Sequence, residues 1–395
     1  MRKDRYGENV GSVSVEPKRN SIEVGRRFWI EVTYTAGPFG VKTGGVLRFK
    51  LPGLVLKNDP LGPVSCSNPD VEWESSNHLP MVNGKPCFEF STIDYLFVSL
   101  QKGELLAGDT LTVRYGTSAV SNISAPTWAC EWPVEVAVDV DGSRSAPGSG
   151  FLLVPDPPLL AFTHGRPFRM EAFAPSYGSV GAPFRLVTRV MDRYGNIVED
   201  FTGTVSLQAQ RGDNLIDLGE HTFEPGHRGV MTVELPGFDE PGVYRIAVWS
   251  DSLGIQARSN PMKISPFGEV GLYWGDTHCH SRLSADSSAI NERIRQPAED
   301  YVYARDRAAL DFCMVTDHVE DQCEADWEET RRAAREADEP GRFVAFSAFE
   351  ATFSPLRRDG DKNVYFLEDD EAFLQKGDTS ELYENLKGRN SPVMV

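Results

Sequence analysis

The amino-acid sequence predicts a multidomain protein in which two all-β sandwiches precede the first part of an α/β barrel. The 395 residues exceed what one hydrophobic core normally organises, so two or three domains are expected. Alternating apolar and polar residues, interrupted by glycine and proline, fill the first two thirds of the chain and are typical of antiparallel strands. Short apolar runs alternate with helical segments in the remainder. We place the domains at residues 1–154, 159–266 and 270–395.

The first domain is predicted from runs in which every second residue is apolar. These runs lie at residues 28–34, 110–115 and 134–140. Strands of this pattern bury one face of a sheet and expose the other. The proline cluster at residues 155–158 fits neither a central strand nor the interior of a helix, so it is interpreted as a linker to the next domain.

The second domain has the clearer sandwich pattern. Strand-like runs lie at residues 184–190, 203–207, 229–235 and 242–249, and residues 192–196 form a predicted turn. Several short strands in about a hundred residues resemble an immunoglobulin-like or bacterial surface-repeat sandwich. Such modules bind carbohydrate, bind protein or act as spacers, and the fold does not choose among these roles.

In the third domain, each predicted strand ends in polar residues. Apolar runs lead to His278-Cys279-His280, to Asp317-His318 and to Glu350, and helical stretches at 297–309 and 326–337 separate them. The intervals of 38 residues from His280 to His318 and 32 from His318 to Glu350 suit a strand-helix-strand unit, which takes roughly 30 residues. Because the C-terminal ends of parallel barrel strands meet at one rim, we expect these side chains to converge there.

The His-x-His pair is the most informative motif in the chain. Residues two apart on a strand share one face, so His278 and His280 can hold one metal ion. Cys279 should face the other way and is interpreted, like Cys313, as a packing residue. A lone histidine is more often a core or surface residue, and His221 is assigned to that class. Three histidines and a carboxylate at successive strand ends instead favour a metal site.

These motifs resemble the opening half of the PHP (polymerase and histidinol phosphatase) superfamily, in particular a large branch that opens with Trp-Gly-Asp-Leu-His-x-His-Ser. The resembling segments are Trp-Gly-Asp-Thr-His-Cys-His-Ser at residues 274–281, Thr-Asp-His at 316–318 and Phe-Glu-Ala-Thr at 349–352. The resemblance covers residues 270–395. It implies a distorted (β/α)7 barrel and a site with two or three metal ions that hydrolyses phosphate esters.

The resemblance also implies a set of ligands. His278 and His280 would bind one ion together with Glu350, which would bridge to a second ion. His318 would bind a third ion, with Asp286 as its companion. Asp286 has an alternative interpretation as a turn residue, because aspartate is favoured in a loop such as the one after the histidine pair.

Two departures from the superfamily pattern affect the expected site. Asp361 stands where the branch has a metal-binding histidine, and a carboxylate favours harder ions than an imidazole does. The later ligands of the superfamily, including a distal Asp-x-His pair, have no counterpart in the 395 residues. We therefore expect the chain to be part of a longer protein and its metal site to be incomplete as given.

The ligand types indicate zinc, manganese or iron as the cofactor, with two or three ions in the complete protein. Close ions of this kind lower the pKa of a bound water and offset charge on a phosphoryl group, so a metal-dependent phosphoesterase is the expected function. Arg282 follows the histidine pair and could contact a substrate phosphate. The alternative for Arg282 is an exposed loop residue.

Composition restricts the partners. The net charge of −18 disfavours binding to nucleic acid, whereas a metal-lined pocket can still accept a small phosphorylated substrate. No apolar stretch reaches the length of a membrane span and the N-terminus lacks a signal-peptide core, so a cytoplasmic location without membrane contact is expected. An odd number of cysteines in the first domain (Cys66, Cys87 and Cys130) argues against a full disulfide framework.

Two alternatives remain open. An amidohydrolase also begins with His-x-His, but it would next require a lysine or glutamate on a middle strand, and the arrival of His318 one repeat later fits the PHP pattern better. The second alternative is a binding or scaffolding protein with an inactive or incomplete barrel. In that case the β-sandwiches would make the contacts with protein or carbohydrate.

Overall fold

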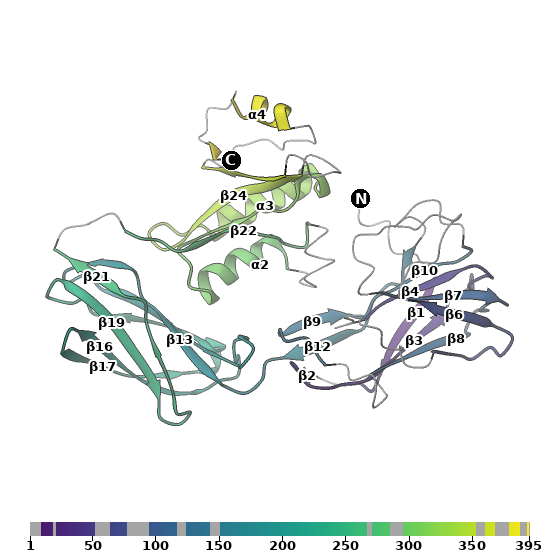
Figure 1. The fold of residues 1–395 in the computed structure, drawn as a ribbon, viewed down its shortest axis with the longest axis horizontal. Helices are drawn as coiled ribbons and strands as arrows, with labels where there is room; N and C mark the ends of the chain where they lie inside the picture. Colours follow the sequence, from purple (N-terminus) through teal and green to yellow (C-terminus); the bar gives the residue numbers. More distant parts are fainter. Residues whose placement is uncertain are drawn as a thin grey trace. The chain divides into compact units, whose positions relative to one another are not determined.

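A computed structural model describes residues 9–18, 21–51, 64–76, 95–116, 124–142, 151–266, 271–284, 295–352, 360–367, 379–387 and 393–394. The chain divides into two compact units, Met1–Gly165 and Arg166–Val395. The described residues of the first unit form strands and no helix, and the second unit contains a β-sandwich followed by an α/β part (Figure 1). The expectation of a β-rich, multidomain chain is thus confirmed. None of the helices in these described ranges is long and apolar enough to cross a membrane.

The first unit is built from two larger sheets and a smaller one that enclose a shared apolar core. The sheet orders are β1-β3-β8-β5, β11-β10-β4-β7-β6 and β2-β12-β9. Alternation is clear in β3, where every second residue from Ile30 to Ala36 is buried. The strands are β1 (Gly11–Glu16), β2 (Ile22–Glu23), β3 (Ile30–Ala36), β4 (Val46–Lys50), β5 (Val64–Cys66), β6 (Glu72–Ser76), β7 (Tyr95–Lys102), β8 (Thr110–Tyr115), β9 (Cys130–Pro133), β10 (Val136–Asp139), β11 (Leu152–Leu153) and β12 (Leu159–Thr163).

The boundary after the first unit differs from the expected linker at residues 155–158. Strand β12 follows these prolines but pairs with β9 and β2, so it lies in the first unit rather than at the start of the next one. The pairing buries Leu160 and Phe162 in the core of the first unit. A proline cluster marks an interruption of regular structure, and the strand beyond it can return to the same core.

The sandwich of the second unit has its own core between two sheets, ordered β13-β15-β18 and β14-β21-β19-β16-β17, with β20 paired to β19. Its turn at Asp192 is fixed by the carboxylate, which accepts hydrogen bonds from the backbone N–H groups of Tyr194 and Asn196. The elements are β13 (Arg169–Phe173), β14 (Tyr177–Ser179), β15 (Phe184–Met191), β16 (Gly203–Arg211), β17 (Asn214–Phe223), η2 (Pro225–His227), β18 (Val230–Leu235), β19 (Gly242–Ser250), β20 (Ile255–Arg258) and β21 (Met262–Ser265).

The α/β part contains one five-stranded sheet in the order β22-β23-β24-β25-β26. The first three strands are parallel, whereas β25 is antiparallel to both β24 and β26. The elements are β22 (Gly275–Cys279), α2 (Pro297–Val302), η3 (Tyr303–Arg307), β23 (Phe312–Val315), η4 (Val319–Asp321), α3 (Glu324–Ala337), β24 (Val344–Thr352), β25 (Asp361–Phe366), α4 (Thr379–Lys387) and β26 (Val393–Met394).

The described residues form this open sheet and do not close a (β/α)7 barrel. Three parallel strands with intervening helices agree with the start of such a barrel, but the series stops at β24. Residues 353–360 connect β24 to β25, and a parallel crossover needs a dozen or more residues. The short connection therefore makes β25 antiparallel.

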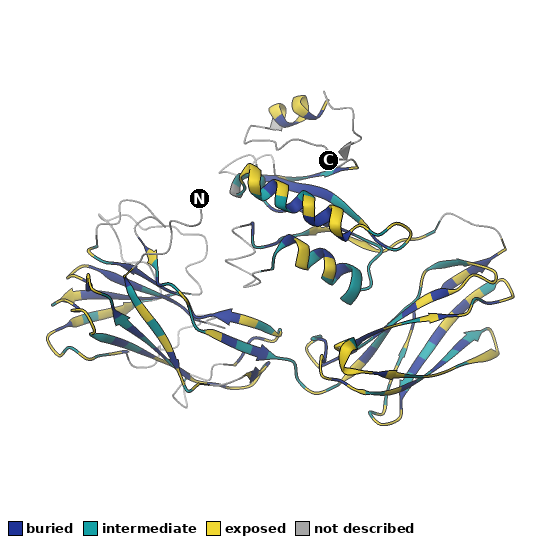
Figure 2. Cartoon of the chain, turned by 180° about the vertical axis from the view of Figure 1, so that it is seen from behind, coloured by how far each residue is buried: buried dark blue, intermediate teal, exposed yellow. Residues whose placement is uncertain are grey.

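Helices α2 and α3 cover one face of this sheet. Helix α3 buries Trp327, Thr330, Ala334 and Ala337 at helical spacing, which produces the stripes on α3 in Figure 2. Tyr301 of α2 is fully buried, and its hydroxyl donates to the carbonyl oxygen of Phe346 on β24 at 2.8 Å. The helices thereby fix the strands and leave the opposite face for other side chains.

Candidate metal centre

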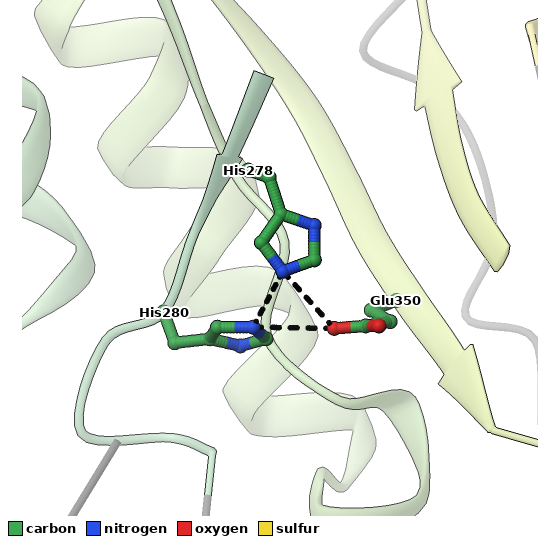
Figure 3. A group of neighbouring side chains, drawn as sticks. All are labelled: His278, His280 and Glu350. Carbon is green, nitrogen blue, oxygen red and sulfur yellow. Dashed lines mark hydrogen bonds and ion pairs between the residues drawn. The ribbon is translucent and has the colours of Figure 1, made fainter. Parts of the chain in front are cut away.

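Strand alternation places the candidate ligands on the face opposite the helices. Cys279 and Ala345 pack with the helix residues in one apolar cluster. Successive side chains on a strand point to opposite faces, so His278, His280 and Glu350 point away from α2 and α3. Strand β23 lies between β22 and β24 but ends at Val315, and the three side chains meet beyond that end. Figure 3 shows both imidazoles and the carboxylate directed at one another.

The distances between these side chains suit a bound ion. The Nε2 atoms of His278 and His280 are 2.9 Å apart. Glu350 Oε2 lies 3.1 Å from His280 Nε2 and 3.5 Å from His278 Nε2. Two atoms about 2.0 Å from a tetrahedral zinc ion are about 3.3 Å apart. The three groups could therefore bind one metal ion between them, as expected from the sequence.

His318 adds a third imidazole to this group. It follows β23 and forms a single parallel bridge with Glu350, which brings the two residues side by side. Its Nε2 lies 3.5 Å from Glu350 Oε2, and its ring stacks on that of His280 with centroids 5.1 Å apart. Three imidazole nitrogens thus face one carboxylate oxygen. Glu350 is only 5% exposed, and a buried carboxylate needs compensation of this kind.

A second group of polar residues contacts the outer nitrogens of the three imidazoles, that is, the Nδ1 atoms, which are not the ones directed at Glu350. Asn363 Nδ2 lies 2.7 Å from His278 Nδ1, Ser284 Oγ lies 3.0 Å from His280 Nδ1, and Thr352 Oγ1 lies 3.2 Å from His318 Nδ1. Metal-binding histidines ordinarily use their second nitrogen in this way, because the contact fixes the ring and the position of its proton. Each histidine therefore has a partner that directs its Nε2 toward Glu350.

Glu320 is a further partner of His318, with Oε1 3.3 Å from Nδ1. Burial raises the pKa of Glu320, but hydrogen bonds from His318, its own backbone N–H and Thr352 outweigh this effect, so the pKa lies below its ordinary value. Glu320 is therefore ionised at neutral pH. A carboxylate on the outer nitrogen increases the basicity of the imidazole as a ligand.

The matching family and the curated relative carry no named activity. Residues 268–322 match a family described as a protein of unknown function (DUF3604), a range that includes the histidine pair and His318 but not Glu350. An uncharacterized protein of Chlamydia pneumoniae is 24% identical over 189 residues, which make up 47% of this chain and 29% of that protein. The chain thus spans less than a third of the length of this curated relative.

Solved structures resemble parts of the chain at low overall similarity. A superoxide reductase (neelaredoxin) from Ignicoccus hospitalis is 19% identical, with 25% of this chain and 82% of the reductase covered and a TM-score of 0.20. The D0-D1 domain of intimin is 12% identical, with 64% of this chain and 97% of that domain covered and a TM-score of 0.19.

Two other residues predicted from sequence, Asp361 and Arg282, have hydrogen-bond partners other than Glu350. Asp361 Oδ1 accepts a hydrogen bond from Thr352 Oγ1 at 2.8 Å, so it is connected to His318 through a hydroxyl. The guanidinium of Arg282 donates to both carboxylate oxygens of Glu329, at 3.0 and 3.1 Å, and also to Gln296. Asp286 lies outside the described residues.

Four contacting residues were not predicted from sequence: Ser284, Glu320, Thr352 and Asn363. Thr352 lies within a motif that resembles the PHP superfamily, and Glu320 follows His318 by two positions. The positions of Thr352 and Glu320 in the sequence indicated that they would lie near the histidines. They did not indicate which ring nitrogen each side chain contacts.

Proposed function

We propose that the α/β part binds a divalent metal ion and that the protein is a metal-dependent hydrolase acting on phosphate esters. The observation that carries the proposal is the convergence of three imidazole Nε2 atoms on Glu350 Oε2. Nitrogen and carboxylate donors suit zinc, iron or manganese. The resemblance to the PHP superfamily gives the reaction class.

Each residue has a part in this proposal. His278, His280 and Glu350 would hold the ion, and His318 would hold the same ion or a neighbouring one. When bound, a divalent ion would lower the pKa of a water molecule and offset negative charge on the phosphoryl group. The buried Glu350 would contribute a carboxylate ligand to the ion, and Asn363 contacts the His278 ring and keeps it in position.

Whether Asn363 donates a hydrogen bond to His278 Nδ1 or accepts one from it depends on the orientation of the Asn363 side-chain amide. Asn363 Oδ1 is buried without a hydrogen-bond partner among the described residues. If His278 Nε2 binds an ion, Nδ1 carries the ring proton and needs an acceptor. A half-turn of the amide places Oδ1 against Nδ1 and satisfies both atoms. The Asn363 amide can therefore serve as donor or as acceptor for His278 Nδ1.

The test compares metal binding and hydrolysis in His278→Ala, His280→Ala and the unchanged protein. We expect both variants to lose bound zinc or manganese, measured by calorimetric titration and elemental analysis, and to lose any turnover of p-nitrophenyl phosphate together with it. His221→Ala is the control, because His221 lies on β17 in the sandwich. Turnover that persists without bound metal would overturn the mechanism. Metal binding without turnover of phosphate esters would instead support a binding protein.

A further inference from the structure

Asp361 is connected to the candidate metal centre through one threonine hydroxyl. Asp361 on β25 and Thr352 on β24 are paired across the antiparallel strands, so the register places them side by side. Thr352 Oγ1 donates a hydrogen bond to Asp361 Oδ1 at 2.8 Å and lies 3.2 Å from His318 Nδ1. Among the described residues, the group whose ligand atoms lie within 4.8 Å of one another includes Glu350 but not Asp361.

Glu320 is the second partner of the same ring nitrogen. Its Oε1 lies 3.3 Å from His318 Nδ1, and its Oε2 accepts a hydrogen bond from the backbone N–H of Thr352 at 3.4 Å. One carboxylate thus contacts both the ring of His318 and the end of the strand that carries Thr352. Glu320 and Thr352 therefore face Nδ1 together.

The count of hydrogen atoms then fixes the position of the ring proton on His318. A threonine hydroxyl has one hydrogen and two lone pairs, and an ionised carboxylate only accepts hydrogen bonds. With its hydrogen given to Asp361, Thr352 Oγ1 can only accept from His318 Nδ1. Glu320 also only accepts. Nδ1 must therefore carry the proton, which leaves the lone pair of Nε2 directed at Glu350.

Glu350 competes for this proton on the other side of the ring. Its Oε2 lies 3.5 Å from His318 Nε2, whereas the two acceptors at Nδ1 lie at 3.2 and 3.3 Å. Hydrogen bonds from N–H groups usually span about 2.7 to 3.2 Å, so the shorter contacts at Nδ1 are favoured. If Thr352 instead donated its hydrogen to Nδ1, the ring proton would move to Nε2.

We propose that Asp361 is a positioning residue that acts through Thr352, and not the metal ligand expected from the sequence. By accepting the hydroxyl hydrogen, Asp361 makes Thr352 an acceptor and keeps the lone pair of His318 Nε2 free. The use of that lone pair to bind an ion rests on the proposed metal centre. Removal of the Asp361 carboxylate should therefore have an effect only while the Thr352 hydroxyl is present.

The first measurement records the ring nitrogens of His318 by long-range ¹H–¹⁵N NMR in the metal-free protein, with the resonances assigned by His318→Gln. Spectra at about pH 9 are used, because an imidazole with the ordinary pKa of about 6.5 is neutral there. We expect the Nδ1–H tautomer in the unchanged protein and in Thr352→Val, where Glu320 still accepts. Asp361→Ala should increase the share of the Nε2–H tautomer, because the Thr352 hydroxyl is then free to donate to Nδ1.

The second measurement is a double-mutant cycle on zinc affinity, determined by calorimetric titration. Asp361→Ala should weaken zinc binding about 10-fold, the usual effect of losing an outer partner of a ligand. The same substitution should cause little further loss in Thr352→Val, whereas loss of a direct ligand would weaken binding in both backgrounds. Thr330→Val is the matched control, because the Thr330 hydroxyl donates to the Asp326 carbonyl oxygen on α3. It should change neither the tautomer nor the affinity.

Three results would overturn the inference: the Nε2–H tautomer in the unchanged protein, an unaltered tautomer in Asp361→Ala, or an equal effect of Asp361→Ala on zinc affinity with and without Thr352→Val. The first needs no variant, so a variant that fails to fold does not leave the question open. Failure of the unchanged protein to bind zinc or manganese would overturn the proposed metal centre instead. The tautomer of metal-free His318 would still decide the role of Asp361.

Discussion

Tyr365 on β25 donates its hydroxyl hydrogen to the carbonyl oxygen of Thr277 on β22, at 3.1 Å. Two strands separate β22 from β25 in the sheet, a distance of about 14 Å if the sheet were flat. The direct contact therefore means that the sheet is strongly curved. Its concave face carries the metal-ligand candidates, and the curvature brings Asn363 of β25 within reach of His278.

Tyr365→Phe should remove the hydrogen bond to the Thr277 carbonyl oxygen and leave the aromatic ring in place. We expect a loss of about 1 kcal/mol in the free energy of unfolding, the usual contribution of one hydrogen bond. Chemical denaturation measures the change. Tyr383→Phe, on an exposed position of α4, should leave the stability unchanged. Equal stability of the two variants would contradict a structural role for the Tyr365 hydroxyl.

Asn363→Ala should reduce zinc affinity about 10-fold, because the ring of His278 loses the partner of its outer nitrogen. Isothermal titration of metal-free protein with zinc provides the measurement. Lys362→Ala changes the adjacent residue on the same strand, whose side chain points to the other face, and should alter affinity by less than Asn363→Ala does. The prediction fails if Lys362→Ala has the larger effect.

How much of this arrangement could be predicted depended on whether the signal was local. Strand periodicity locates β15 and β19, and the two-residue period places His278 and His280 on one face. Which strand pairs with which depends on contacts distant in sequence. Strand β12 therefore joined the first unit against expectation, and the antiparallel direction of β25 followed from a short connection rather than from its own pattern.

The residues that contact the histidine rings could not be predicted from the sequence for a related reason. Asn363 contacts His278 across 85 positions, and that contact exists because the sheet curves. Ser284 is close to His280 in sequence, but a serine in a loop has many ordinary uses. Only its contacts with the ring of His280 and the backbone of His318 distinguish it from its neighbours.

Trp327→Ala should destabilise the α/β part by about 3 to 5 kcal/mol, the usual cost of removing a large buried aromatic side chain. Trp327 packs edge-on against Phe349 and Phe366, with ring centroids 5.8 Å from each. Thermal unfolding followed by circular dichroism should show a transition shifted to lower temperature, while the sandwiches, which have separate cores, retain theirs. Val302→Ala, at an exposed position of α2, should leave the temperatures of all unfolding transitions unchanged. A single unchanged transition for Trp327→Ala would argue against separate cores.

Asp306 should contribute to stability in a pH-dependent way. Hydrogen bonding with Arg305 and the charges of Arg305 and Arg342 lower the pKa of Asp306 below its ordinary value of 3.8, against the effect of burial. A carboxylate whose pKa is lower in the folded state stabilises the protein above the ordinary value, and this contribution disappears as the pH falls through the folded value.

Asp306→Asn should therefore cost stability at neutral pH and flatten the loss of stability below about pH 4. The side chain is a third exposed, so solvent screening limits the effect to roughly 0.5 kcal/mol. Denaturation at pH 7 and pH 3 measures the difference, and 1 M salt should reduce it. If Asp306→Asn shows the same pH dependence of stability as the unchanged protein, the ion pairs of Asp306 do not cause that dependence.

Cys279 stands between the two histidines in sequence, yet its sulfur lies on the helix side of β22, 3.9 Å from the sulfur of Cys313. The hydrogen bond between these thiols and their burial raise the pKa of Cys279 far above its ordinary value. Because successive side chains of a strand point to opposite faces, the Cys279 sulfur lies away from the nitrogen and oxygen atoms of His278, His280 and Glu350. Among the described residues the candidate ligand group contains no sulfur, so the direction of the Cys279 side chain would disfavour copper(I) and other thiophilic ions at this site.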